Sequence, residues 1–185
     1  MEMSEHEKQW LTALGAEMVA TLGVTTGSTV VDFGCGIGRY TIPISQVAGK
    51  TGKVFAVERT AEELIELRER MTRFGNPDAV AVLNCEDIQL QSIEDGSVDQ
   101  LLAFDVLQYI DDKNRFFESV SRVLKPKGQV HVYPAAIPHP GAVDMGQIES
   151  ALNQAGLIRV GKMRFRMMHN KDIVHDDVHT FSAAT

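Results

Sequence analysis

The feature that most constrains the fold is an apolar run that ends near a carboxylate and continues into three glycines at alternate positions. The run is Val30–Phe33 with Asp32 near its end, and the glycines are Gly34, Gly36 and Gly38. Glycine has no Cβ, so the backbone can turn sharply there and a ligand can approach it closely. The pattern predicts a first β-strand, a tight ligand-binding loop and the start of a helix.

The spacing of these glycines limits the kind of ligand. A dinucleotide fingerprint has the spacing G-x-G-x-x-G or G-x-G-x-x-A and places a pyrophosphate on the helix N-terminus. Here the third glycine comes one position early, and Arg39 stands in its place. The carboxylate of Asp32 would repel a pyrophosphate but would suit a ligand that carries an ammonium or sulfonium group. These residues therefore favour S-adenosylmethionine over a dinucleotide.

Apolar runs alternate with helical patterns along the chain, which is typical of βαβ units and a mostly parallel sheet. The expected strands after the first are 53–58, 79–83, 98–104 and 129–133, and two further extended segments, 158–168 and 172–181, have no helix between them. That last pair is expected to form an antiparallel hairpin. The predicted fold is α/β, a doubly wound, mostly parallel seven-stranded sheet with a C-terminal antiparallel hairpin.

The length of 185 residues fits one domain. We expect an amphipathic helix over residues 1–24, a cofactor-binding core over 25–135, and a last helix and the terminal hairpin over 136–185. A turn is expected over Lys125–Gly128, between a helix and the fifth strand.

Three segments of the chain resemble one known family. The segment Asp32–Gly38 is similar to motif I of the class I, Rossmann-like S-adenosylmethionine-dependent methyltransferases. Val98–Ile110 resembles motif IV and its continuation, and Val123–Gly128 resembles the helix-to-strand turn that is common in the family. The resemblance spans roughly residues 25 to 135 and implies the Rossmann-like fold, S-adenosylmethionine as cofactor and methyl transfer to an unidentified acceptor.

The resemblance also implies a set of cofactor-binding residues. Glu58, at the end of the second strand, matches the position that accepts the ribose hydroxyls, and Asp87 matches the adenine position, with Glu86 as the alternative register. The full predicted set is Asp32, Gly34, Cys35, Gly36, Gly38, Glu58, Arg59, Glu86, Asp87, Ala103 and Phe104. Ala103 stands where relatives often have a polar residue.

The sequence does not identify a catalytic residue. Methyl transfer is an in-line displacement, so orientation supplies much of the rate, and a base is needed only if the acceptor arrives protonated. Tyr109 and His139 are the candidates, since both are expected beside the acceptor, although packing or solvent exposure also explains each of them. His169, His175 and His179 suggest a metal site, but extended chain would hold the last two too far apart, so no metal is expected.

Two other functions stay open. The chain could be a module that binds S-adenosylmethionine as a regulator or scaffold without turnover, or, less favoured by the glycine spacing, an NAD-dependent oxidoreductase.

Composition limits the partners and the location. The formal net charge is -7, which disfavours sequence-independent binding of nucleic acid. The N-terminus has no signal-peptide pattern and no apolar run approaches the length of a membrane span, so we expect a cytoplasmic protein that does not bind membranes. The expected partner is a methyl acceptor, either a small molecule or a protein. Because no large cap over the site is expected, either the acceptor is bulky or a second subunit, in a homodimer, closes the site.

Overall fold

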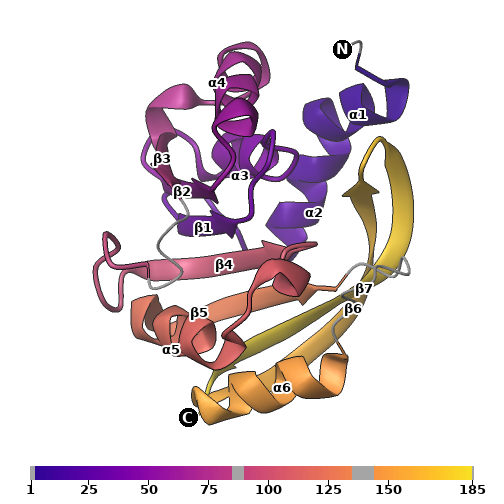
Figure 1. Ribbon diagram of the computed structural model, residues 1–185. Helices are drawn as coiled ribbons and strands as arrows, with labels where there is room; N and C mark the ends of the chain where they lie inside the picture. The colour runs from indigo at the N-terminus through magenta and orange to yellow at the C-terminus, as the bar shows by residue number, and fades with distance from the viewer. Residues whose placement is uncertain (1–2, 85–89, 135–143, 185) are drawn as a thin grey trace.

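The sheet has seven strands in the order β3-β2-β1-β4-β5-β7-β6, as Figure 1 shows for the computed structural model. The structure describes residues 3–84, 90–134 and 144–184. The first five strands pair in parallel, whereas β5 with β7 and β7 with β6 are antiparallel. The strands are β1 Thr29–Phe33, β2 Lys53–Glu58, β3 Val80–Asn84, β4 Val98–Phe104, β5 Leu124–Tyr133, β6 Leu157–His169 and β7 Asp172–Ala183. The predicted fold class is confirmed.

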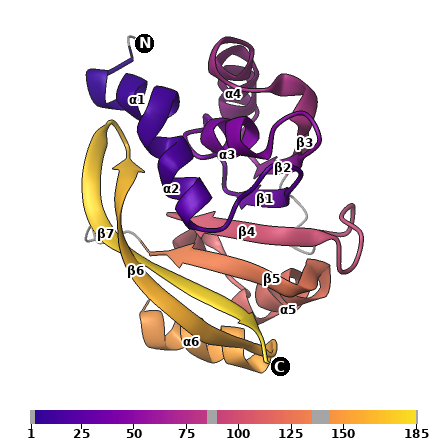
Figure 2. The ribbon, with the colours of Figure 1, turned by 180° about the vertical axis from the view of Figure 1, so that it is seen from behind.

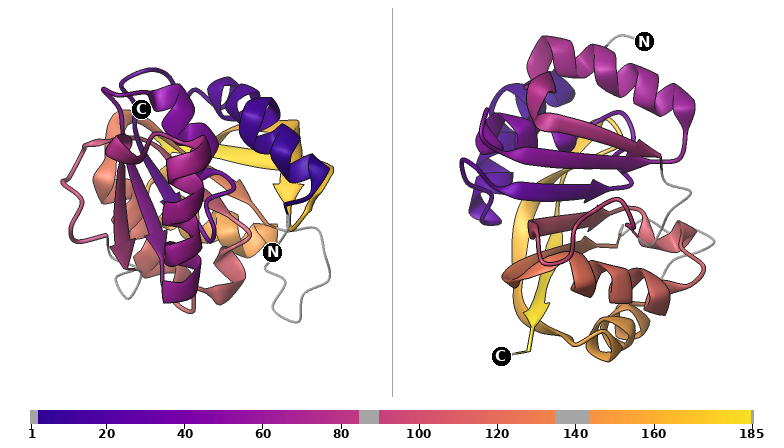
Figure 3. Two further views of the ribbon diagram at one scale, coloured as in Figure 1. Left: turned by 90° about the horizontal axis from the view of Figure 1, so that it is seen from above. Right: turned by 90° about the vertical axis from the view of Figure 1, so that its left-hand side faces the viewer.

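Helices cover both faces of the sheet (Figures 1 and 3). A continuous N-terminal helix consists of α1 (Glu5–Gln9), the π-helical η1 (Trp10–Leu14) and α2 (Gly15–Thr21). With α3 (Thr41–Ala48) and α4 (Ala61–Phe74) it packs on one core. The second core lies under α5 (Lys113–Val123) and α6 (Met145–Gln154), and two short 3-10 helices, η2 (Pro77–Ala79) and η3 (Leu107–Tyr109), complete the described helices. Alternate residues of β1 point into opposite cores, Val30 into the first and Val31 into the second, because side chains of a strand alternate between faces. Every helix in the described parts of the chain is too short or too polar to cross a bilayer.

The terminal hairpin reaches well beyond its place in the sheet. Strand β7 pairs with β5 only from Gln129↔Ser182 to Val132↔His179, whereas its pairing with β6 continues to His169↔Asp172. The outer half of the hairpin therefore leaves the sheet and curves over α1 and α2 (Figure 2). The Tyr40 hydroxyl lies 3.1 Å from both the backbone N and the backbone O of Met168 and so holds the tip in place. This curvature brings the tip to the carboxyl ends of the parallel strands.

The prediction of a turn over Lys125–Gly128 was wrong. Strand β5 begins at Leu124, which pairs with Val98, and the next pair along β4 is Gln100 with Gln129. The extra residues of β5 form a bulge, and a Cβ on Gly128 would lie 2.7 Å from the Val98 carbonyl oxygen. Gly128 permits this close approach. A glycine at this place in the sequence is equally typical of a bulge and of a turn, so the sequence alone does not distinguish them.

Three polar side chains from neighbouring strands are connected by hydrogen bonds across the sheet. His131 of β5 is 1% exposed, its Nε2 lies 2.7 Å from Gln100 Oε1 of β4, and its Nδ1 lies 3.0 Å from Thr180 Oγ1 of β7. Burial lowers the pKa of His131 from 6.5 to about 3. The folded protein therefore holds this imidazole in its neutral form.

The lowered pKa of His131 predicts how the stability of the protein changes in acid. Below pH 6.5 the unfolded chain protonates His131 but the folded protein does not until about pH 3, so the free energy of unfolding falls as the pH drops through that window. The limiting slope is about 1.4 kcal/mol per pH unit. Urea unfolding at pH 7, 6 and 5 should show that the free energy of unfolding falls less in His131→Gln than in the unchanged protein. An equal fall in the two proteins would contradict the lowered pKa of His131. Asp32 has the opposite effect in the same pH range. Burial raises its pKa to about 6, so proton uptake by Asp32 stabilises the folded state as the pH falls. The comparison with the His131 variant separates the two effects.

Candidate functional site

A cavity of about 440 Å³ lies at the carboxyl ends of β1, β2 and β4. Ligands of open α/β sheets bind at this edge, where the strand order reverses, and small-molecule pockets commonly have this size. The cavity is lined by the glycine loop, the end of β2 and the segment after β4: Phe33, Gly34, Gly36, Glu58, Arg59, Thr60, Glu63, Asp105, Val106, Tyr109 and Ile110.

The three glycines of the loop have different roles. All have positive φ, at 79° for Gly34, 51° for Gly36 and 86° for Gly38. A Cβ on Gly34 would lie 2.5 Å from Val106, and one on Gly38 would lie 2.3 Å from Leu67. A Cβ on Gly36 would meet only Glu63 Oε1, at 3.8 Å, so Gly36 is the glycine with open space above it. The first and third glycines thus allow tight packing, and the second leaves room for a ligand.

Glu58 presents a rigidly held carboxylate to this cavity. Its Oε1 accepts hydrogen bonds from the backbone N–H groups of Arg59 at 2.8 Å and Thr60 at 3.0 Å, and its Oε2 accepts one from Gly36 N–H at 3.0 Å. The residue is only 8% exposed. Each oxygen of a carboxylate has two lone pairs, so Glu58 keeps acceptor capacity for a hydroxyl-bearing ligand.

Asp32 lies behind the loop and does not line the cavity. It is 2% exposed and accepts a hydrogen bond from Thr41 Oγ1 at 2.6 Å. Burial is the main cause that raises its pKa to about 6, and the nearby Glu58 carboxylate adds to the shift. Burial also raises the pKa of the neighbouring Cys35 thiol, so this sulfur stays protonated. Asp32 and Glu58, from the ends of the neighbouring strands β1 and β2, thus lie close together.

The other predicted residues divide into three groups. The Arg59 guanidinium lies 5.6 Å from the centre of the Tyr109 ring, and both residues line the cavity. Ala103 and Phe104 are buried and do not line it. The adenine candidates Glu86 and Asp87 and the catalytic candidate His139 lie outside the described residues.

The structure pairs two residues that the sequence analysis did not connect. His169, at the hairpin tip, has its Nδ1 2.7 Å from Oδ2 of Asp105, which directly follows β4 and lines the cavity. Asp105 has a φ of 53°, and its Oδ1 is buried without a hydrogen-bond partner. Burial raises the pKa of Asp105, and the hydrogen bond from His169 opposes that shift. In the sequence, the only local signal for this pair was the position of Asp105 directly after a predicted strand.

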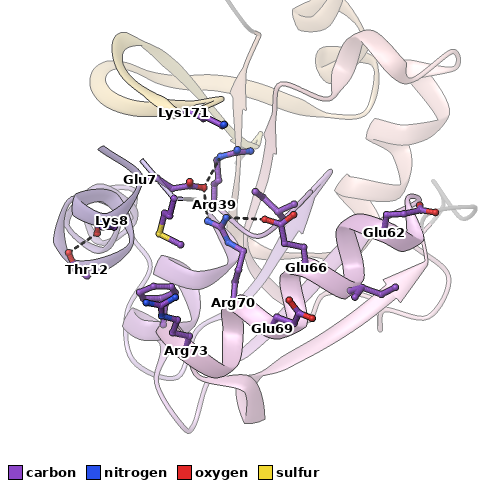
Figure 4. Close-up of a pocket in the computed structure, with 14 residues that line it drawn as sticks. Glu7, Lys8, Thr12, Arg39, Glu62, Glu66, Glu69, Arg70, Arg73 and Lys171 are labelled. Atoms are coloured by element: carbon purple, nitrogen blue, oxygen red, sulfur yellow. Dashed lines mark hydrogen bonds and ion pairs between the residues drawn. The ribbon is translucent and has the colours of Figure 1, made fainter. Parts of the chain in front are cut away.

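A larger cavity of about 720 Å³ lies between α1 and α4 (Figure 4). The buried Glu7 carboxylate is at its centre, 2.7 Å from Arg70 Nη2 and 3.5 Å from Arg39 Nε. The Arg39 carbonyl accepts a hydrogen bond from Trp10 Nε1 at 2.7 Å. Arg39 thus connects the loop to the N-terminal helix. A dinucleotide fingerprint has glycine or alanine at this position, whereas here the arginine has a structural role.

Together, these features define a Rossmann-like cofactor-binding domain of the methyltransferase type. The sheet order, the glycine loop after β1, the fixed acid that ends β2 and the antiparallel strands at the edge carry this assignment. The loop is packed tightly at Gly34 and Gly38, and the open space at Gly36 leaves room for a ligand beside Glu58.

Comparison with known proteins identifies the family. Residues 31–132 match the family model described as "Methyltransferase domain", so the chain belongs to this methyltransferase family. It is similar to the ubiquinone/menaquinone biosynthesis C-methyltransferase UbiE of Cellvibrio japonicus, with 29% identity over 117 residues, 63% of this chain and 47% of that protein. An arsenite methyltransferase of Aquipseudomonas alcaligenes is 31% identical over 110 residues, 57% of this chain and 32% of that protein. The chain thus spans about a third to a half of the length of these curated relatives.

Solved structures agree on the fold. A SAM dependent methyltransferase from Aquifex aeolicus superposes with a TM-score of 0.74 at 20% identity, covering 95% of this chain and 92% of that one. A Haemonchus contortus phosphoethanolamine N-methyltransferase in complex with S-adenosylhomocysteine gives a TM-score of 0.65 at 20% identity, covering 86% of this chain and 42% of that one. The predicted family is confirmed, and with it, at the level of the family, the predicted cofactor S-adenosylmethionine.

Proposed function

We propose that this protein transfers a methyl group from S-adenosylmethionine to an acceptor. The observation that carries the proposal is the arrangement of Glu58 and Gly36, a fixed carboxylate beside the one loop glycine with open space above it. A ribose offers hydroxyl donors to such an acceptor, and the open loop can take the methionine part.

The described residues suit this cofactor in charge as well as in shape. When bound, S-adenosylmethionine supplies a methyl group that its sulfonium has already activated. The charge of Glu58 contributes to raising the pKa values of both Asp32 and Glu63, so the region around the loop is negative. A negative region favours a cation and disfavours a pyrophosphate. The adenine contact of Asp87, or of Glu86, stays a prediction.

The acceptor is not carried over from the relatives. One relative is named for ubiquinone/menaquinone biosynthesis and another for arsenite, so membership of the family does not define the acceptor. The homodimer, the disfavoured binding of nucleic acid and the cytoplasmic location also stay predictions.

The test begins with binding. Calorimetry with S-adenosylhomocysteine and with NAD should show binding of the first alone, and binding of NAD alone or of neither compound would overturn the proposal. Tritium-labelled S-adenosylmethionine is then incubated with the protein and cell extract. A labelled product supports methyl transfer, whereas cofactor binding without any labelled product favours a scaffold.

A Glu58→Gln variant should bind S-adenosylhomocysteine about 10- to 100-fold more weakly. Glutamine has one oxygen in place of two, so an NH₂ group would face one of the backbone N–H donors, and hydrogen bonds to a charged group are each worth about 1.5–3 kcal/mol. Glu62→Gln, on the neighbouring helix and outside this cavity, is the matched control. Equal affinities in the two variants, by calorimetry on folded protein, would show that Glu58 does not hold the ligand.

A further inference from the structure

The carboxylate–imidazole pair of Asp105 and His169 joins the cavity to the hairpin tip. Its two side chains come from elements 64 residues apart and meet at 2.7 Å. The contact is supported from both sides: Asp105 N–H donates to the Tyr133 carbonyl at 3.0 Å, and the Tyr40 hydroxyl holds Met168, the neighbour of His169. The pair is therefore built into the fold.

The hydrogen bond determines which nitrogen of the imidazole is free. When Asp105 is ionised and the imidazole is neutral, Nδ1 carries the proton between the two side chains, and Nε2 is left with a lone pair. The His169 side chain keeps 15% of its surface exposed, and its Nε2 has no partner among the described residues. A neutral imidazole oriented by a carboxylate is an arrangement suited to accepting a proton.

Asp105 lines the cavity just after β4, and Glu58 lines it at the end of β2, on the other side of β1. His169 contacts Asp105 but is not itself one of the lining residues. If Glu58 holds the ribose, the rest of the cavity, toward Asp105, is left for the methionine part and the acceptor. The Oδ1 atom of Asp105 is buried and has no hydrogen-bond partner among the described residues. Neither Tyr109, half exposed at the mouth, nor His131, buried in the sheet, has a comparable position.

We propose that His169 is the base that accepts the proton of the methyl acceptor, with Asp105 as its positioning residue, and that the acceptor presents an O–H, N–H or S–H group. This inference rests on the proposed function. The acceptor's lone pair forms the new bond to the methyl carbon, the electron pair of the sulfur–methyl bond is left on sulfur, and the acceptor's proton goes to Nε2 of His169.

Two titratable groups in the described parts of the chain interact with the pair through charge. Asp176 of β7 acts on Asp105 through its charge, and Tyr40 at the start of α3 also senses the Asp105 charge. The negative charge of Asp176 favours a proton in this region, which helps the pair to receive one from the acceptor.

The first test needs no acceptor. Nitrogen-15 NMR of the histidine rings at pH 8, with His169 assigned by its loss in His169→Gln, should show a protonated Nδ1 and a bare Nε2. In Asp105→Ala, the proton should shift toward Nε2. A protonated Nε2 in the unchanged protein at pH 8 would overturn the proposal.

The second test uses the labelled product of the methyl-transfer assay. His169→Gln should lower the rate at pH 7 by about 100-fold or more, with partial recovery as the pH rises, while the affinity for S-adenosylhomocysteine stays within about twofold. His175→Gln, the same substitution at an exposed site on the same hairpin, should leave both unchanged. A methyl group found on carbon or arsenic, or a pH profile unchanged in His169→Gln, would overturn the proposal. Failure of S-adenosylhomocysteine to bind the unchanged protein would instead overturn the proposed function.

Discussion

A Gly36→Val variant should lose binding of S-adenosylhomocysteine by at least about 100-fold. Gly36 has a φ of 51°, which a β-branched residue rarely adopts, and its Cβ position faces open space in the cavity. A valine side chain would occupy the space that we assign to the ligand. It would also disturb the N–H that donates to Glu58 Oε2 at 3.0 Å. Calorimetry on folded protein measures the loss.

The control for this variant is Gly96→Val. Gly96 has a similar φ of 61°, and no atom lies within 4 Å of its Cβ position, so the backbone strain is comparable without any contact to the cavity. Both variants should lose stability, by about 1–3 kcal/mol, but only Gly36→Val should lose binding. Unchanged affinity in Gly36→Val would place the cofactor elsewhere.

A Glu7→Gln variant should lower the free energy of unfolding by about 3–5 kcal/mol, because it removes one partner of a buried ion pair. The Glu7 side chain is 4% exposed and lies against two guanidinium groups, those of Arg70 and Arg39 (Figure 4). The Nε atoms of both arginines are already buried without a hydrogen-bond partner. Without the carboxylate, the remaining ion pair of Arg70 among the described residues is the one with Glu66 at 3.4 Å.

Urea unfolding at pH 7 measures this effect, with Glu5→Gln as the control. Glu5 belongs to the same helix, but its side chain is 72% exposed and its ion pair with Lys8 is 3.7 Å long. Surface pairs of this kind contribute about 0–1 kcal/mol. A Glu7 variant as stable as the Glu5 variant would mean that the cluster does not hold α1 against α4.

Much of the fold could be predicted because its signals are local. The alternation of apolar runs and helical periods, the glycines at 34 and 38, and the acid that ends β2 are each written in a few consecutive residues. Parallel strands with helices between them leave few permitted topologies, so the sheet follows from such short patterns. The family resemblance rests on the same local segments, and the comparison confirmed it.

The bulge in β5 and the position of Asp32 could not be predicted in this way. A glycine after Lys-Pro-Lys signals a turn, and only the pairing of Val98 with Leu124 shows that the segment belongs to the sheet. An acid before a glycine loop suggests a direct ligand contact. Its hydrogen bond to Thr41, nine residues later, instead holds it behind the loop.

The cofactor loop, the mostly parallel seven-stranded sheet and the terminal hairpin could be predicted from the amino-acid sequence, since each depends on neighbouring residues or on a rule of chain connection. The pairing of Asp105 with His169 could not be predicted from the sequence. It depends on how far the hairpin twists away from β5 and curves over α2, and that is set by packing between segments more than a hundred residues apart, such as Tyr40 and Met168. Local patterns carry no information about such a distance, so the proposed base became visible only when the chain was folded.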